Sequence, residues 1–168
     1  VIDEMVEDFD PDKKHFLLAH AFITNSETST SDKAAVIGTA TQISAQIFEG
    51  FDYVALGHIH KPQDVNDSIR YCGTPMAYSF GKEETQEKSV TIVDTETMEH
   101  KIVPLHPLHK RTTLTGTLEE LLHPEAEEDV INGYVKLKVT DKPVGLESLT
   151  QLKEIYSNLF ECESRSFD

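Results

Sequence analysis

The sequence is poor in cysteine and in basic residues, and it contains no long hydrophobic run. Its 168 residues include only two cysteines, Cys72 and Cys162, which lie far apart and lack the spacing of a metal-binding motif. We therefore expect reduced thiols and a cytoplasmic location. No apolar stretch approaches the roughly 20 residues that cross a bilayer, so the sequence predicts a soluble protein.

The shortage of basic residues gives the chain a strongly acidic balance. Fifteen Lys and Arg stand against 30 Asp and Glu, which gives a formal net charge of −15. Because a protein that coats nucleic acid usually carries a basic stripe, the composition argues against simple coating of nucleic acid. The apolar fraction of 38%, with eight Phe and five Tyr, is too high for a disordered acidic tail and predicts a folded core.

Hydrophobic patterns predict a sheet with helices in the first part of the chain. Apolar residues recur at helical spacing from Ile2 to Phe9, which predicts an amphipathic helix that ends before Pro11. Continuous apolar runs at 16–19 and 53–56 predict buried strands, and the first of them is expected to be covered on both faces. Further strands are predicted at 36–41, 68–72, 89–94 and 100–104.

Two segments between the strands differ in character. Residues 24–33, directly after His20, are almost all polar and predict an exposed loop. Apolar residues at helical spacing between Ile43 and Phe48 predict a short helix that ends at Gly50.

Prolines divide the sequence into two regions, 1–110 and 111–168. Pro104 is expected to end the strand before it, and Pro107 lies in the connection that follows. After this connection the sequence predicts strands at 112–115 and 134–139 and helices at 118–122 and 146–156. Alternation of strands and helices predicts a second small α+β unit. The acidic cluster at 125–129 is expected to be an exposed loop.

Three histidines follow predicted strands directly. His20 ends the first apolar run, and the string GlyHisIleHis at 57–60 places His58 and His60 just after the second. Since ligands of α/β proteins gather at the carboxyl ends of strands, the three imidazoles are expected to face one crevice and to bind a divalent metal ion. A single histidine at a strand end is more often a surface residue. The five remaining histidines lack this placement and are interpreted as structural or solvent-facing.

Several strings, taken in order, resemble one known family. They are residues 17–20, 51–63, 69–76, 78–80 and 88–94. They resemble the second half of the phosphoesterase domain of the SbcD family, the calcineurin-like metallophosphoesterases that serve as nuclease subunits of bacterial SbcCD complexes. Residues 116–122 and 134–141 resemble the start of that family's DNA-capping domain.

This resemblance implies a fold and a site. Residues 1–110 would be the second half of a calcineurin-like α/β/β/α sandwich, and residues 111–168 would be part of a small α+β capping domain. His20 and His58 would bind one manganese ion and His60 a second one. Such a two-metal site activates a water molecule for attack on a phosphodiester.

The strings that carry the family's other ligands are not found in the sequence. These are an AspXxxHis, a GlyAsp and an AsnHis string, which in the family hold the bridging carboxylate, further ligands and the catalytic histidine. We therefore expect a fragment whose catalytic residues lie upstream of Val1. Because a carboxylate must bridge both ions, the chain alone is expected to be inactive.

The resemblance also implies substrates and partners. The complete protein would be a DNA exonuclease and endonuclease in repair, recombination and replication, with DNA, an SbcC-like ATPase and a second nuclease subunit as partners. Lys61, Arg70 and Lys82 are candidates for phosphate contacts, although lone basic residues are usually solvated. Bound cations would offset the acidic balance where a phosphate approaches, so the net charge says little about the substrate.

Two other functions remain open at this point. The GlyHisXxxHis string is shared across calcineurin-like phosphoesterases, so the chain could belong to an enzyme that acts on small phosphate esters. Alternatively, it could be a non-catalytic module that docks a partner through its acidic surface. The predicted capping unit at 111–168 favours the nuclease, because a phosphatase for small substrates would not need it.

Overall fold

The computed structural model describes residues 2–29, 31–32 and 42–164, and these form two compact units. The first unit comprises the residues up to Tyr78 together with Gln86–His106. The second comprises Ser79–Thr85 and the residues from Pro107 onward. The sequence predicted regions 1–110 and 111–168, and their assignment to a phosphoesterase domain and a capping domain stays a prediction; in the structure the segment Ser79–Thr85 belongs with the second unit. The mixture of sheets and short helices is compatible with the predicted α+β class.

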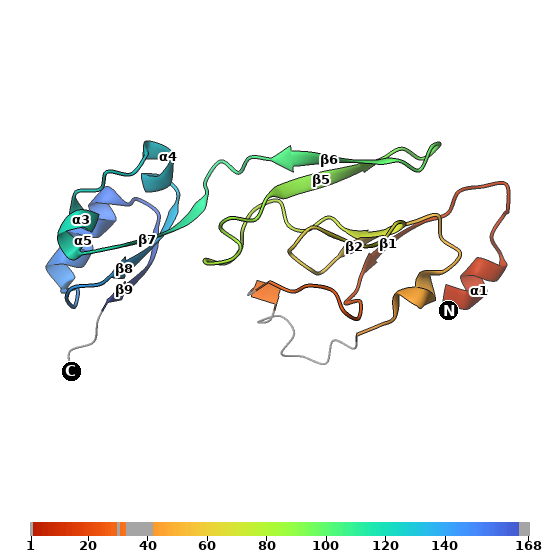
Figure 1. Cartoon of the computed structure of the whole chain (residues 1–168), viewed down its shortest axis with the longest axis horizontal. Helices are drawn as coiled ribbons and strands as arrows, with labels where there is room; N and C mark the ends of the chain where they lie inside the picture. The colour runs from red at the N-terminus through yellow and green to blue at the C-terminus, as the bar shows by residue number, and fades with distance from the viewer. Residues whose placement is uncertain (1, 30, 33–41, 165–168) are drawn as a thin grey trace. The chain divides into compact units, whose positions relative to one another are not determined.

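A mixed four-stranded sheet forms the centre of the first unit (Figure 1). Its order is β1 (Phe16–His20), β2 (Tyr53–Gly57), β4 (Ile69–Tyr71) and β3 (Gln63–Asn66). The first three strands are parallel, and β3 is antiparallel to β4. This topology brings the carboxyl ends of β1 and β2 to the same edge, where His20 pairs with Gly57.

One face of this sheet forms the hydrophobic core of the first unit. Val54, Leu56 and Tyr71 are fully buried there, together with Ile23 and Phe48 from outside the sheet. Phe48 comes from a 3-10 helix, η1 (Ala45–Phe48), and Ile2 of helix α1 (Ile2–Glu7) packs against the same core. Because side chains alternate along a strand, Val54 and Leu56 of β2 point to the same face of the sheet.

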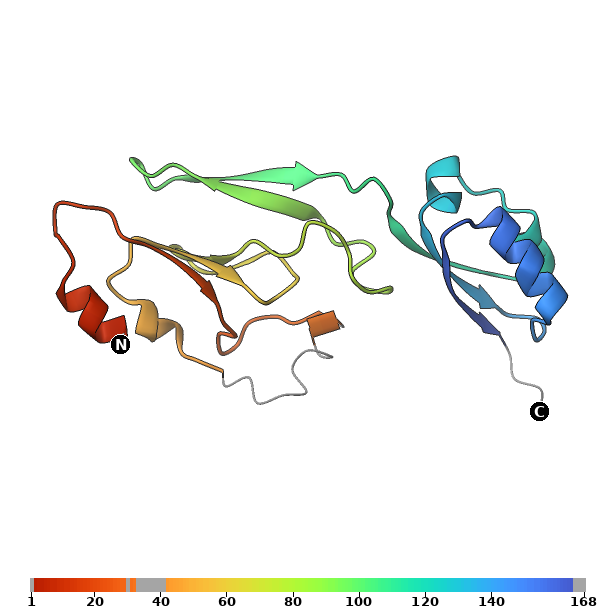
Figure 2. The same ribbon diagram turned by 180° about the vertical axis from the view of Figure 1, so that it is seen from behind.

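A hairpin of β5 (Lys88–Val93) and β6 (His100–Leu105) lies alongside the other face (Figures 1 and 2). Arg70 Nε donates to Thr91 Oγ1 at 3.0 Å, which ties β4 to the hairpin. β6 continues past Pro104, where the sequence predicted an end. Pro104 pairs with Ser89 in the hairpin. Proline lacks a backbone N–H, but β6 has a neighbouring strand on one side only, so no hydrogen bond of the sheet is lost.

The prediction that β1 is covered on both faces is wrong. Phe16 is 40% exposed and Leu18 is 84% exposed, while Leu17 and Ala19 on the opposite face pack against the core. β1 is the edge strand of the sheet. An apolar run alone does not show which faces the rest of the chain covers, and this caused the error.

The second unit is a parallel sheet covered by helices on one face (Figure 2). Its strands are β7 (Arg111–Gly116), β8 (Tyr134–Val139) and β9 (Leu159–Ser164), in that order. Helices α3 (Leu118–Leu122) and α5 (Leu146–Ile155) supply Leu121 and Leu152 to its core, where they join Val135 and Leu137 of β8. Helix α3 begins with a capping box between Thr117 and Glu120.

Most predicted elements are found, with a few additions. The sequence did not indicate β3, β9 or the short helix α4 (Glu128–Ile131), which begins inside the acidic cluster predicted to be a loop. The predicted strand at 36–41 lies outside the described residues. No helix in the described part of the chain combines the length and the apolar character needed to cross a membrane.

Candidate metal site at the carboxyl ends of β1 and β2

Two histidines meet where β1 and β2 end. His20 is the last residue of β1, and His58 follows Gly57, the last residue of β2. His20 Nε2 and His58 Nδ1 are 3.2 Å apart, and the two rings meet edge to face with centroids 5.0 Å apart. The parallel register of the strands therefore brings two imidazole nitrogens to one point, where the sequence predicted that all three histidines would meet.

The backbone at His58 has an uncommon conformation. Its φ is 101°, in the region that favours glycine. Non-glycine residues adopt such angles rarely and at a cost, often at functional sites. Here the conformation turns the chain directly after β2.

The Nε2 nitrogen of His58 is buried and has no hydrogen-bond partner among the described residues. Its Nε2 is one of three buried side-chain polar atoms there that lack a partner, and the Phe22 ring lies close by, with a centroid distance of 5.8 Å. Buried polar atoms in proteins are nearly always paired, so an unpaired one is a reason to look for a missing ligand.

His60 makes different contacts. Its Nδ1 lies 2.6 Å from Ser31 Oγ, its backbone N–H donates to Asp32 Oδ1 at 3.0 Å, and its ring meets the Tyr78 ring edge to face. Across the described ranges, no group of three or more His, Cys, Asp or Glu side chains is arranged to hold a metal ion. The pair of His20 and His58 is thus observed, and a site formed by all three histidines stays a prediction.

The polar segment after β1 is not simply an exposed loop, as the sequence predicted. Ser29 and Asp32 are buried. The segment is also tied to the residues after His60, because Glu27 N donates to Gln63 Oε1 and Gln63 Nε2 donates to Glu27 O at 2.7 Å. Lys61 pairs with the Glu27 carboxylate, and this hydrogen bond lowers the Glu27 pKa. We call residues 26–29 with 31–32 the clamp segment.

The three predicted phosphate contacts lie in different surroundings. Lys61 is held by Glu27 in the clamp segment. The Arg70 side chain is only 6% exposed, and its guanidinium donates to Asp64 Oδ1 at 2.6 Å. Lys82 is exposed and belongs to the second unit. A role for any of them in phosphate binding stays a prediction.

Sequence reasoning missed the part that Ser31 and Asp32 play in this site. A polar run without hydrophobic pattern predicts a loop but does not show where the loop folds. The available signal was local: a serine three residues before an aspartate is typical of side chains that bond to nearby backbone. Ser29 N does donate to Asp32 Oδ2 at 2.6 Å.

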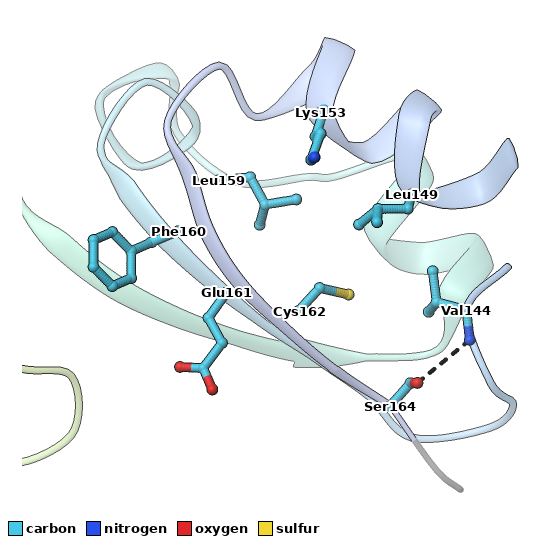
Figure 3. Close-up of a pocket in the computed structure, with 8 residues that line it drawn as sticks. All are labelled: Val144, Leu149, Lys153, Leu159, Phe160, Glu161, Cys162 and Ser164. Atoms are coloured by element: carbon cyan, nitrogen blue, oxygen red, sulfur yellow. Dashed lines mark hydrogen bonds between the residues drawn. The ribbon is translucent and has the colours of Figure 1, made fainter. Parts of the chain in front are cut away.

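A separate groove lies in the second unit, between α5 and β9 (Figure 3). Leu149, Leu159 and Cys162 point into it, and Ser164 Oγ accepts from Val144 N at its end. Burial raises the pKa of the Cys162 thiol, which makes it a poor nucleophile. Apolar and polar side chains line the groove in similar measure, and its lining residues include no group of catalytic side chains.

Comparison with known proteins relates the whole chain to one family. No family model matches the chain. A curated protein of Staphylococcus epidermidis, named as the SbcD component of the SbcCD nuclease, is 31% identical over 99% of the chain. A protein of the same name from Staphylococcus saprophyticus is 28% identical over 100% of the chain. The predicted resemblance to SbcD is confirmed. The chain spans about half the length of these SbcD relatives, 46% and 45% respectively.

Proposed function

We propose that this chain forms part of a metal-dependent DNA nuclease subunit of the SbcD type, in which His20, His58 and His60 bind divalent cations. The approach of His20 Nε2 and His58 Nδ1 to 3.2 Å, at the ends of paired parallel strands, carries the proposal. Two relatives named as nuclease subunits, similar over nearly all of the chain, support the choice of reaction.

The residues present fit such a cation in their chemistry. Neutral imidazole is a common ligand of first-row divalent metals, and the unpaired Nε2 of His58 indicates that its ring lacks a neighbour. Manganese, the cation implied by the family, also takes carboxylate oxygens. The proposal assigns these further ligands to polypeptide outside the 168 residues, in keeping with relatives about twice this length.

The chain's own contribution is to hold the imidazoles in place. The hydrogen-bonded register of β1 and β2 fixes the spacing of His20 and His58, and the clamp segment fixes His60. When bound, the cations would polarise a phosphoryl oxygen and lower the pKa of a bound water. Without the remaining ligands, the chain alone would bind manganese weakly and would not cleave DNA.

The proposal extends to the fold and partners of the complete protein. The first unit would form the second half of a calcineurin-like sandwich, and the second unit would form part of a DNA-capping domain. DNA is the proposed substrate, and an SbcC-like ATPase and a second nuclease subunit are the proposed partners.

A chimera tests the activity. In it, this chain replaces the matched 46% of the Staphylococcus epidermidis relative. With manganese the chimera should cleave linear duplex DNA, and the substitutions His20→Ala, His58→Ala and His60→Ala should each lower the rate by about 100-fold or more. His106→Ala, at an exposed histidine outside the site, is the matched control and should leave the rate unchanged.

The same chimera separates the proposal from its alternatives. Hydrolysis of a generic phosphomonoester with no cleavage of duplex DNA would indicate a phosphatase for small substrates. Wild-type cleavage by the His58→Ala chimera would overturn the metal assignment. Nanomolar manganese binding by the 168-residue chain alone would contradict the incomplete site.

A further inference from the structure

Lys88 is a buried lysine beside the turn that carries His60. It is the first residue of β5 and is only 4% exposed. Lysine is rarely buried this fully unless its side-chain nitrogen is paired. Lys88 Nζ donates to three oxygens, namely His60 O at 3.3 Å, Thr74 Oγ1 at 3.1 Å and Gln86 Oε1 at 2.8 Å. The side chain therefore links the start of β5 to the segments that follow β2 and β4.

The carbonyl oxygen of His60 is the point at which these segments meet. Besides the bond from Lys88 Nζ, it accepts from Thr74 N at 3.2 Å. Thr74 Oγ1 donates to Met76 O at 2.8 Å, and its lone pairs accept from Lys88. The packing around the turn is tight, since a Cβ atom at Gly73 would lie 2.8 Å from His60 O. Lys88 thus holds the main chain at His60 through its carbonyl group.

The amide group of His60 is held separately, by the clamp segment. His60 N donates to Asp32 Oδ1 at 3.0 Å. The N–H and the C=O of one residue flank its Cα atom, so two bonds at these groups fix the direction of the Cα–Cβ bond. The position of the imidazole therefore depends on the bond from Lys88 as well as on the clamp segment.

We propose that Lys88 is a positioning residue for the candidate cation site and acts on His60 through its carbonyl oxygen. The cation-binding part of this inference rests on the proposed function. Removal of the Lys88 donor would loosen the turn on the side of β5, so the imidazole would spend less time where it meets the cation. Outer residues that hold a metal ligand in place typically contribute about 10- to 100-fold to metal affinity.

A double-mutant cycle in the chimera tests the route through His60. Lys88→Met keeps an unbranched side chain but removes the donor, and it should weaken manganese binding by about 10-fold. In the His60→Ala background the same substitution should leave the remaining manganese binding unchanged, because its route to the cation is already lost. Equal losses in both backgrounds would overturn the inference, since they would indicate general damage to the fold. Lys101→Met, at an exposed position of the same hairpin, is the matched control and should have no effect in either background.

Two NMR measurements on the metal-free 168-residue chain need no cation. In the wild type, the amine hydrogens of Lys88 should exchange slowly with water, because the group is buried and hydrogen-bonded. Exchange as fast as that of Lys101 would overturn the inference, and this result does not depend on whether any variant folds. In Lys88→Met the carbonyl carbon resonance of His60 should shift, and in Lys101→Met it should not. An unshifted resonance in folded Lys88→Met would also overturn the inference.

These measurements separate failure of the inference from failure of the proposed function. Absence of manganese binding by the wild-type chimera would overturn the proposed function. Slow exchange at Lys88 and a shifted His60 carbonyl would in that case still support Lys88 as the residue that positions the turn. Manganese binding that is equally tight in the wild-type and Lys88→Met chimeras would overturn the inference alone.

Discussion

Gly57 lies so close to His20 that a Cβ atom at residue 57 would be 3.1 Å from His20 Nδ1. Contacts this short are rare, so one of the two groups would have to move. His20 is exposed at the end of an edge strand, and its ring can turn without disturbing the core. Gly57 therefore controls the orientation of a candidate ligand more than it controls the fold.

The substitution Gly57→Ala should weaken cation binding without unfolding the first unit. Displacement of the His20 ring should lower the manganese affinity of the chimera by about 10-fold, a typical effect of misplacing a ligand. The free energy of unfolding should change by less than about 1 kcal/mol, because the ring yields rather than the core. Titration and denaturant unfolding measure the two quantities. Gly145→Ala, where an added Cβ meets nothing within 4 Å, is the control, and equal affinities of the two variants would contradict the prediction.

Two glycines with positive φ should differ in their tolerance of alanine. Gly73 has φ 74°, and an added Cβ would lie 2.7 Å from Pro62 Cδ and 2.8 Å from His60 O. Gly81 has φ 91° but open space around it. Gly81→Ala should cost about 1–2 kcal/mol from backbone strain alone, and Gly73→Ala should cost clearly more because the clash is added. Denaturant unfolding of each variant checks the order, and a smaller loss at Gly73 would refute it.

Each unit contains a buried tyrosine hydroxyl that forms hydrogen bonds. We expect removal of the two hydroxyls to reduce stability by different amounts. Tyr71 OH accepts from Ile23 N at 2.9 Å and donates to Ala21 O at 2.7 Å, which fixes the chain just after His20. Tyr156 OH makes one such bond, to Leu121 O at 2.9 Å. Each Tyr→Phe substitution leaves buried backbone groups unpaired, at about 1–3 kcal/mol. Tyr71→Phe should be the more damaging in thermal unfolding, and the reverse order would contradict this account.

The elements that the sequence predicted well are those with dense apolar patterns. β8 and α3 were predicted with their observed bounds, because apolar residues alternate along β8 and recur at helical spacing along α3. β3 and β9 were missed for a physical reason. β3 is largely polar and is a strand because it pairs with β4, and β9 breaks its alternation at a register shift next to β8. Pairing between strands depends on the tertiary fold and is not visible in the local sequence pattern.

The candidate site was predictable only in part. Strand ends placed His20 and His58 together, because parallel strands share a carboxyl edge. The partners of His60 could not be predicted from the sequence. Ser31 and Asp32 lie 28 or more residues before His60 and reach it only through the tertiary fold of a polar segment. The contacts among Ser29, Ser31 and Asp32 beside His60 likewise exist only in the folded chain.

Glu84 should make the second unit sensitive to acid. Its carboxylate accepts from Thr113 N at 2.8 Å, from Thr113 Oγ1 and from Gly81 N, which ties the segment Ser79–Thr85 to β7. Burial favours the neutral acid, but these hydrogen bonds outweigh it and hold the Glu84 pKa below its ordinary value of 4.5. A carboxyl with a lowered folded-state pKa stabilises the fold above its unfolded value, and this stabilisation is lost as the pH falls through the folded pKa.

The substitution Glu84→Gln should therefore destabilise the second unit at neutral pH and reduce its response to acid below about pH 4.5. Hydrogen bonds to charged groups contribute about 1.5–3 kcal/mol each, so a loss of this order is expected. Hydrogen exchange at the Thr113 amide and denaturant unfolding between neutral and acidic pH measure the effect. Glu125→Gln, at an exposed carboxylate of the same unit, is the control. If the free energy of unfolding depended on pH in the same way for Glu84→Gln and wild type, the prediction would be wrong. That result would mean that protonation of the Glu84 carboxylate does not affect the stability of β7.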